Sequence, residues 1–392
     1  MSEPLQLLPG HRPRVLQGHP WVYASELKDA DRIPTPASGE TRDLVDARGR
    51  PLGTGLVNPK SQIRWRRLDG AEPGQPLDSA FWQRSLERIP ARRACEKPFQ
   101  RLVFSDADGL PGLIIDRFED LLVVQAQTLG VDLQLPAILA VLEERFSPTD
   151  IILRNDAPAR KLEGLPRTTG TRSGNRCEPR WFTIDGIAYF LDLEEGQKTG
   201  FYLDQRQQHR RVAGLAEGRT VLDCFANQGA FALQALKAGA TAATAIESSA
   251  DCCVRMRANA DRNGLNLEVV EANVFDWFTH NRDSRWDLII LDPPSFARNR
   301  KAVKGALRGY KELNLRALQM LNPGGVLATY SCSQHVDPAT FAETVRDALG
   351  DAGRRARILD TTTQPPDHPQ LLHFPESQYL NGLVLEVPGS RF

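Results

Sequence analysis

The sequence has no excess of charge of either sign and no long apolar run. Its 49 Lys and Arg residues are matched by 49 Asp and Glu residues. A polyanion would therefore have to bind at a local basic patch rather than to an overall basic surface. No apolar stretch approaches the roughly 20 residues that a helix needs to cross a bilayer, and the N-terminal residues lack the regions of a signal peptide. We therefore expect no membrane partner.

Cysteine is sparse and irregularly spaced. The six cysteines include one adjacent pair, Cys252 and Cys253, and no C-x-x-C motif. This spacing matches neither a disulfide framework nor a zinc site, so we predict no metal site. Reduced thiols are typical of the cytoplasm, and we expect the protein to be cytoplasmic.

Length and pattern predict a multi-domain protein. A chain of 392 residues is long for one domain, and its composition, 41% hydrophobic and 25% charged, is that of a globular protein. Short alternating runs broken by Gly and Pro predict an N-terminal β-barrel over residues 1–72. Residues 73–189 mix strand and helix signals, which predicts a central α+β domain. Strands and helices alternate over residues 190–392, which predicts a C-terminal α/β domain with a parallel, doubly wound, Rossmann-like sheet.

Three segments of the central region carry specific predictions. Two apolar runs, residues 113–118 and 120–125, predict a β-hairpin. The segment from Pro136 to Phe146 predicts an amphipathic helix. The segment from Arg160 to Arg180 is polar and rich in glycine, which predicts a mobile loop.

The first strand-to-helix turn of the C-terminal domain has the residues of a nucleotide site. Gly229 ends the segment Asp223–Gly229 and lets the backbone approach a ligand closely. Glu247 ends the second strand, the position from which an acid binds ribose hydroxyls, and Asn273 follows the third strand, where it would border the adenine. The G-x-G-x-x-G fingerprint of dinucleotide enzymes is missing, which favours S-adenosylmethionine over NAD. The candidate cofactor residues here are Asp223, Phe225, Asn227, Gly229, Glu247 and Asn273, although Glu247 and Asn273 could instead only cap helices.

An acid and a thiol follow two apolar strands of the same domain. Asp292 comes directly after the strand 288–291, and Cys332 comes after the strand 326–330. If both strands belong to one parallel sheet, the two side chains emerge at the edge where such sheets bind ligands. The prolines Pro293 and Pro294 constrain the path of the loop after Asp292.

These two groups suggest covalent chemistry on a cytosine ring. Carbon 5 of cytosine is a poor nucleophile, but addition of a thiolate to carbon 6 activates it toward a methyl sulfonium. We assign Cys332 as the nucleophile and Asp292 as the group that stabilises the activated ring. The alternative for Cys332 is the usual role of a free cysteine, a small buried apolar side chain.

Two basic segments are candidate RNA contacts. Arg300 and Lys301 follow the loop Asp292–Phe296, and positive charge beside a cleft can hold phosphates. In the N-terminal region, Arg64 and Arg66 flank Trp65, an aromatic within a basic run. Each pattern also has a purely structural explanation. Arg300 and Lys301 could lie on a solvated helix face, and Arg64 and Arg66 could point outward from an edge strand. The target cytosine would have to be unpaired or flipped out. The candidate RNA contacts are Pro293, Pro294, Ser295, Phe296, Arg300, Lys301, Arg64, Trp65 and Arg66.

Several segments together resemble the bacterial large-subunit ribosomal RNA methyltransferases that make 5-methylcytosine in 23S rRNA. The segments that carry the resemblance are Gly18–Tyr23, Asp108–Arg117, Glu195–Arg206, Asp292–Phe296 and Ser331–Ser333, and the likeness covers essentially the whole chain. It implies a PUA-type RNA-binding barrel followed by a class I methyltransferase domain. It also implies that Cys332 is the nucleophile. The family places the segment Glu195–Arg206 against the cofactor, which implies roles for Lys198, Thr199 and Phe201. Asn273 stands where many relatives have Asp.

The resemblance implies a methyltransferase that uses S-adenosylmethionine and acts on 23S ribosomal RNA or the large ribosomal subunit. Monomer and homodimer both remain open, as does the nucleotide that is modified. Two other functions also remain open. One is methylation of another RNA base or atom with Cys332 in a structural role, and the other is a non-catalytic factor in ribosome assembly.

Overall fold

The computed structural model describes residues 3–9, 13–37, 39–92, 98–196, 199–297 and 299–388. The chain forms two compact units. The first unit comprises residues 1–179, 191–203 and 366–377, and the second comprises residues 180–190, 204–365 and 378–392.

The first unit begins with a five-stranded sheet that has a small apolar core of its own. Trp65 is fully buried in this core with Leu44 and Val22. The strands, in their order across the sheet, are β1 (Leu5–Gln6), β3 (Thr41–Val45), β4 (Pro51–Val57), β5 (Ile63–Arg67) and β2 (Trp21–Tyr23).

A second five-stranded sheet of the first unit packs against two long helices. The hairpin predicted here is confirmed, because β7 and β8 pair antiparallel from Leu113↔Ala126 to Phe118↔Leu121. The strands, in order, are β10 (Thr168–Thr171), β9 (Asp150–Asn155), β8 (Leu121–Ala126), β7 (Leu113–Phe118) and β6 (Phe99–Phe104), and the two long helices are α1 (Ser79–Arg92) and α2 (Leu129–Phe146). A short helix, α3 (Ala159–Leu162), follows β9.

The helix predicted up to Phe146 is confirmed, but its start and one predicted loop need correction. Helix α2 begins at Leu129 rather than at Pro136, which lies inside it, because Val131 is buried in the core and extends the apolar face of the helix. The segment predicted as a mobile loop contains the ordered strand β10, which pairs antiparallel with β9. The buried Arg160 helps to order this segment, since its guanidinium binds Asp132 at 2.7 Å and the carbonyl of Pro166 at 2.8 Å.

The second unit is built on a seven-stranded sheet in the order β15-β14-β13-β16-β17-β19-β18. The first five strands are parallel, as predicted, and β19 and β18 extend the sheet with antiparallel pairing that was not predicted. The strands are β13 (Thr220–Cys224), β14 (Ala242–Glu247), β15 (Leu267–Glu271), β16 (Trp286–Leu291), β17 (Leu321–Ser331), β18 (Arg357–Thr363) and β19 (Asn381–Val387). A separate two-stranded sheet joins β11 (Arg180–Ile184) to β12 (Ile187–Leu191).

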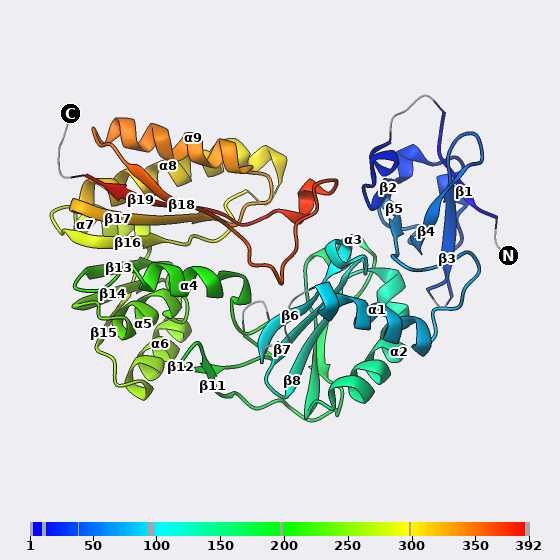
Figure 1. Cartoon of the computed structure of the whole chain (residues 1–392), viewed down its shortest axis with the longest axis horizontal. Helices are drawn as coiled ribbons and strands as arrows, with labels where there is room; N and C mark the ends of the chain where they lie inside the picture. Colours follow the sequence, from blue (N-terminus) through cyan, green and yellow to red (C-terminus); the bar gives the residue numbers. More distant parts are fainter. Residues whose placement is uncertain are drawn as a thin grey trace. The chain divides into compact units, whose positions relative to one another are not determined.

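Helices cover both faces of this sheet because successive side chains of a strand point to opposite faces. On β16, Ile289 and Leu291 pack with α7, α8 and α9, whereas Leu288 and Ile290 pack with the other group of helices. The two layers are visible in Figure 1. One consists of α7 (Val274–His280), α8 (Val303–Met320) and α9 (Pro338–Asp351), and the other of α4 (Arg206–Ala213), α5 (Ala230–Lys237) and α6 (Ala250–Arg262). The doubly wound sheet is therefore confirmed.

Within the described residues, no helix combines the length and the apolar character required to traverse a bilayer.

Gly382 is the tightest point of the antiparallel extension. It lies on β19 between Tyr330 on β17 and Thr362 on β18, and a Cβ at this position would overlap both side chains. We expect Gly382→Ala to lower the free energy of unfolding by about 1–3 kcal/mol, the typical cost of overpacking. Urea denaturation measures this change. Gly350→Ala is the control, because Gly350 lies exposed in α9 with no atom near its Cβ position, and an equal loss in both variants would contradict the packing argument.

Candidate functional site

The carboxyl ends of the parallel strands form one edge of the sheet in the second unit. The register aligns Cys224 at the end of β13 with Leu291 of β16, and Leu291 with Thr329 of β17. Asp292 therefore leaves the sheet directly beside the nucleotide turn that follows Cys224. Open α/β sheets bind their ligands at this edge.

The loops that carry Asp292 and Cys332 meet at this edge. The thiol of Cys332 donates to the carbonyl oxygen of Pro293 at an S···O distance of 3.6 Å. Cys332 is partly exposed, whereas its neighbours Ser331 and Ser333 are fully buried. The acid loop and the thiol, 40 residues apart in the sequence, thus border the same space.

A buried hydrogen-bond network fixes the two loops to each other. Tyr310 on α8 is fully buried, and its hydroxyl lies 3.0 Å from the Ser331 hydroxyl and 2.8 Å from the Ser333 hydroxyl. The Ser333 hydroxyl also lies 3.2 Å from the Ser295 hydroxyl and accepts from the backbone N–H of Ala297 at 3.2 Å. Ser331 and Ser333 therefore set the position of Cys332 from both sides.

Gln205 orients the candidate catalytic acid. Its side-chain amide donates to Oδ1 of Asp292 at 3.0 Å. Gln205 is itself buried, so the contact is shielded from water, which strengthens it. This hydrogen bond fixes which edge of the Asp292 carboxylate faces the cleft.

The nucleotide turn after β13 has an unusual backbone. Phe225 (φ 65°), Asn227 (φ 50°) and Gly229 (φ 76°) all adopt left-handed conformations within one short turn. A Cβ at Gly229 would lie 2.7 Å from Cγ of Met256, so only glycine fits there. Non-glycine residues with positive φ are costly, and such strain is concentrated at ligand sites. The side chains of Phe225 and Asn227 are partly exposed while their neighbours are buried.

Glu247 and Asn273 complete the row of polar residues along the edge. The Glu247 carboxylate accepts backbone N–H groups from Asn227 at 2.9 Å, Ser248 at 2.8 Å and Ser249 at 2.9 Å. These bonds join the ends of β13 and β14. Asn273 is the N-cap of α7 and accepts from the backbone N–H of Phe275 at 2.9 Å, so the helix-capping role considered for it is confirmed.

Asp223 has the properties of a ligand for a cation. It is 1% exposed, and within the described part of the chain its Oδ1 atom has no hydrogen-bond partner. Burial is the main cause that raises the pKa of Asp223 to about 8, and the carboxylates of Asp292 and Glu247 also raise this pKa. The hydrogen bond from the backbone N–H of Ala232 lowers it in part. Three carboxylates around one turn suit the positively charged sulfonium and amino groups of S-adenosylmethionine, so the residues present fit this cofactor.

Three further cofactor predictions concern the segment of residues 198–201. Lys198 falls outside the described residues. Thr199 and Phe201 belong to the first unit, where the Thr199 hydroxyl donates to Asp116 at 2.7 Å and Phe201 is buried. Their contact with the cofactor stays a prediction.

Of the predicted RNA contacts in the N-terminal sheet, Trp65 needs correction. Trp65 is fully buried in the sheet's core and its indole N–H donates to the carbonyl of Arg42, so its ring cannot stack on a base. The Arg66 guanidinium lies over the ring of Trp21 and pairs with Glu163 at 3.1 Å, while Arg64 lies 3.7 Å from Asp31. Trp65 points into the core because successive side chains of a strand alternate between its two faces, whereas Arg64 and Arg66 stay predicted RNA contacts.

The predicted contacts beside the cleft have varied exposure. Arg300, Lys301 and Pro294 are exposed, Ser295 is half-buried, and Pro293 is buried. Phe296 packs its ring on Tyr310 with centroids 4.9 Å apart. Phe296 therefore supports the loop, whereas Arg300 and Lys301 are accessible to a partner.

Sequence reasoning missed Gln205, Tyr310 and the paired roles of Ser331 and Ser333. Gln205 lies within the segment Glu195–Arg206 already singled out, but its partner Asp292 is far away in the chain. Tyr310 falls on the apolar face of a helix, and no local pattern distinguishes it from a core residue.

Two family models match the chain. A PUA-like domain matches residues 5–69, and an S-adenosylmethionine-dependent methyltransferase matches residues 168–373. Two solved structures share the fold. SMU.776, a methyltransferase complexed with SAH, superposes with a TM-score of 0.83 at 22% identity, over 98% of this chain and 100% of the other. A methyltransferase from Streptococcus mutans superposes with a TM-score of 0.81 at 20% identity and with the same coverage.

Curated relatives align along nearly the whole chain. The ribosomal RNA large subunit methyltransferase I of Shewanella amazonensis is 39% identical over 99% of this chain and 100% of its own length. That of Cronobacter sakazakii is 36% identical with the same coverage. The expected PUA-like and Rossmann-like methyltransferase architecture and the cofactor S-adenosylmethionine are thereby confirmed. This chain belongs to the family of S-adenosylmethionine-dependent methyltransferases that includes the proteins named ribosomal RNA large subunit methyltransferase I.

Proposed function

We propose that this methyltransferase modifies carbon 5 of a cytosine in large-subunit (23S) ribosomal RNA, through a covalent adduct of Cys332 at carbon 6. Relatives named for the large-subunit RNA align along their full length, and a PUA-like domain matches the N-terminal region. The observation that carries the proposal is the meeting of the Cys332 thiol with the loop of Asp292 at the ligand edge of the sheet. RNA as substrate also fits a cytoplasmic protein.

Cys332 has the setting that a nucleophile needs. Its thiol is partly exposed and its backbone is held between two buried serines. In the proposed reaction the thiolate forms a bond to carbon 6, and the electrons of the ring double bond move to carbon 5. After carbon 5 is methylated, a base removes its proton, and the bond to sulfur breaks to restore the ring and the thiolate.

Asp292 acts on the other edge of the ring in this proposal. Its carboxyl group lies at the exocyclic edge of the cytosine, and Gln205 orients it through one carboxylate oxygen. A hydrogen-bond donor at that edge stabilises the activated ring while Cys332 is attached.

The cofactor occupies the row of polar residues beside these loops. Bound S-adenosylmethionine supplies an electrophilic methyl group on a sulfonium. In this proposal, the turn of Phe225, Asn227 and Gly229 approaches it closely, Glu247 binds the ribose, Asn273 lies near the adenine, and Asp223 with Asp292 faces the positive charge. We also propose that Lys198, Thr199 and Phe201 bind the cofactor.

RNA is proposed to reach the site over Pro294 and Ser295, with Arg300 and Lys301 on its phosphates. The target base must be extruded or unpaired, because carbon 6 is inaccessible within a helix. We further propose that residues 1–72, 73–189 and 190–392 act as RNA-binding, connecting and methyl-transferring domains.

The role of Cys332 is tested by Cys332→Ala. We expect methyl transfer to 23S ribosomal RNA to fall by at least about 10³-fold, as when a covalent nucleophile is lost, while S-adenosylmethionine still binds. Incorporation of labelled methyl groups and calorimetry measure the two effects. Cys177→Ala is the matched control, because Cys177 is also partly exposed but lies in the first unit. Full activity of the Cys332 variant would refute the covalent mechanism.

The hydroxyl of Tyr310 is tested by Tyr310→Phe, which removes two hydrogen bonds without leaving a cavity. We expect kcat to fall about tenfold, the scale of one or two hydrogen bonds, with little change in KM, because Cys332 loses its alignment. Tyr189→Phe is the control, since Tyr189 is equally buried but its hydroxyl bonds Gln234. If both variants lose stability alike and keep kcat, Tyr310 is only structural.

Cofactor affinity should depend on pH through Asp223. Because the pKa of Asp223 is raised to about 8, the carboxyl is protonated at lower pH, and binding of a sulfonium cation then requires loss of that proton. We expect affinity to rise as pH approaches 8, by up to about tenfold per pH unit, and binding at pH 7 to release a proton. Calorimetry in buffers of different ionisation enthalpy measures this release. Asp223→Asn should abolish it, and a wild-type protein that releases no proton would exclude this role.

A further inference from the structure

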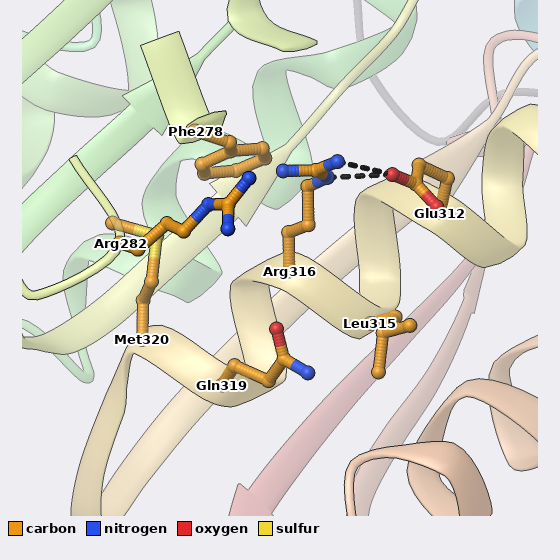
Figure 2. Close-up of a pocket in the computed structure, with 7 residues that line it drawn as sticks. All are labelled: Phe278, Arg282, Glu312, Leu315, Arg316, Gln319 and Met320. Atoms are coloured by element: carbon orange, nitrogen blue, oxygen red, sulfur yellow. Dashed lines mark hydrogen bonds and ion pairs between the residues drawn. The ribbon is translucent and has the colours of Figure 1, made fainter. Parts of the chain in front are cut away.

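A pocket of about 250 Å³ lies between α7 and α8 of the second unit. Met320 in its lining directly precedes β17, and Arg282 lies in the turn that leads to β16. The lining is thus near the amino ends of these strands, whereas the ligand edge is at their carboxyl ends. The pocket therefore opens at the opposite edge of the sheet. Figure 2 shows its lining, which comprises Phe278, Arg282, Glu312, Leu315, Arg316, Gln319 and Met320.

Two guanidinium groups converge in this pocket. Figure 2 shows the side chains of Arg282 and Arg316 ending close together beneath the ring of Phe278. Arg316 binds Glu312 at 2.6 Å and the Thr279 hydroxyl at 3.2 Å. No described residue makes a hydrogen bond or ion pair with the guanidinium of Arg282. The lining thus holds two cations and one carboxylate, and the pocket keeps an uncompensated positive charge with unused N–H donors.

The pocket continues a basic ridge on α8. Lys304, Arg308, Glu312 and Arg316 follow one another at four-residue spacing, so they lie on one face of the helix. Lys304 and Arg308 are exposed, and neither has an ion pair with any residue of the described ranges. The ridge extends about 18 Å from Lys304 to Arg316 at the helical rise of about 1.5 Å per residue. Its other end adjoins Arg300 and Lys301, next to the loop of Asp292.

We propose that the pocket of Arg282 and Arg316 binds a phosphodiester of the substrate RNA backbone, at the far end of a phosphate track along α8. This inference rests on the proposed function. A planar guanidinium matches a phosphate in a bidentate fork, and Gln319 places an exposed amide donor at the rim. The Phe278 ring is buried, so the pocket offers no stacking surface for a base and positions the RNA without reading its sequence.

The pocket suits a phosphate within a chain better than a free phosphate ion. The C-terminal end of α8 carries partial negative charge, and Glu312 adds a carboxylate, so a single anion is held weakly. An RNA strand that also contacts Lys304 and Arg308 is held at several points, and each contact then adds to binding.

Arg282→Gln tests the proposal in the full-length protein with a 23S ribosomal RNA transcript. RNA affinity is measured by filter binding between 50 and 200 mM salt, roughly the range over which phosphate contacts are resolved. We expect a loss of about three- to tenfold at low salt, and a decrease of about 1 in the slope of log K against log salt. Binding of S-adenosylmethionine should not change. Arg285→Gln is the matched control, because Arg285 is exposed and its guanidinium donates only to the carbonyls of Arg282 and Ser284 among the described residues.

Other outcomes separate the possibilities. Gln319→Glu places a second carboxylate at the rim and should weaken RNA binding in the same direction. An unchanged affinity and slope in both the Arg282 and Gln319 variants would overturn the phosphate site. If millimolar inorganic phosphate binds the wild type but not Arg282→Gln, while both proteins bind the RNA equally well, the pocket is a free-anion site and the assignment to RNA is wrong. If the wild-type protein binds no ribosomal RNA at all, the proposed function fails instead.

Discussion

The candidate site depends on the Ser333 hydroxyl and the three groups that share it. This buried oxygen contacts the Tyr310 hydroxyl, the Ser295 hydroxyl and the backbone N–H of Ala297. It therefore joins a helix and two strand-end loops at one point. A buried hydroxyl without partners would be costly, so the loops are stable in the one arrangement that satisfies it. That arrangement leaves Cys332, between two buried serines, facing the loop of Asp292.

The two edges of the sheet in the second unit carry side chains of opposite charge. At the carboxyl edge, Asp223, Glu247 and Asp292 concentrate negative charge around a buried turn, and burial keeps the pKa of Asp223 near 8. A cationic cofactor relieves that repulsion. Along α8 and in the pocket at the opposite edge, Lys304, Arg308 and Arg282 have no acidic partner within the described ranges. A chain with no net charge thus keeps its negative and its positive surfaces apart.

Local patterns predicted the parts of the fold that are governed by short-range rules. Buried apolar runs before Asp223, Glu247 and Asp292 located parallel strands, and Gly229 marked the turn where only glycine fits beside Met256. Predictions failed where distant contacts outweigh local signals. The core contact of Val131 extends α2 past Pro136, Arg160 orders a polar segment by binding Asp132, and the pleat of β5 buries Trp65 although arginines flank it.

The sequence by itself determined the class of the protein, because strand and helix periodicity, the glycine turn and the segments around Asp292 and Cys332 are readable along the chain. Only the tertiary structure decided how these residues act together. The contacts from Gln205 to Asp292 and from Tyr310 to Ser331 and Ser333 join residues far apart in the chain, and Arg282 and Arg316 line one pocket from different elements. No local pattern encodes them, since each exists only once the strands and helices have packed.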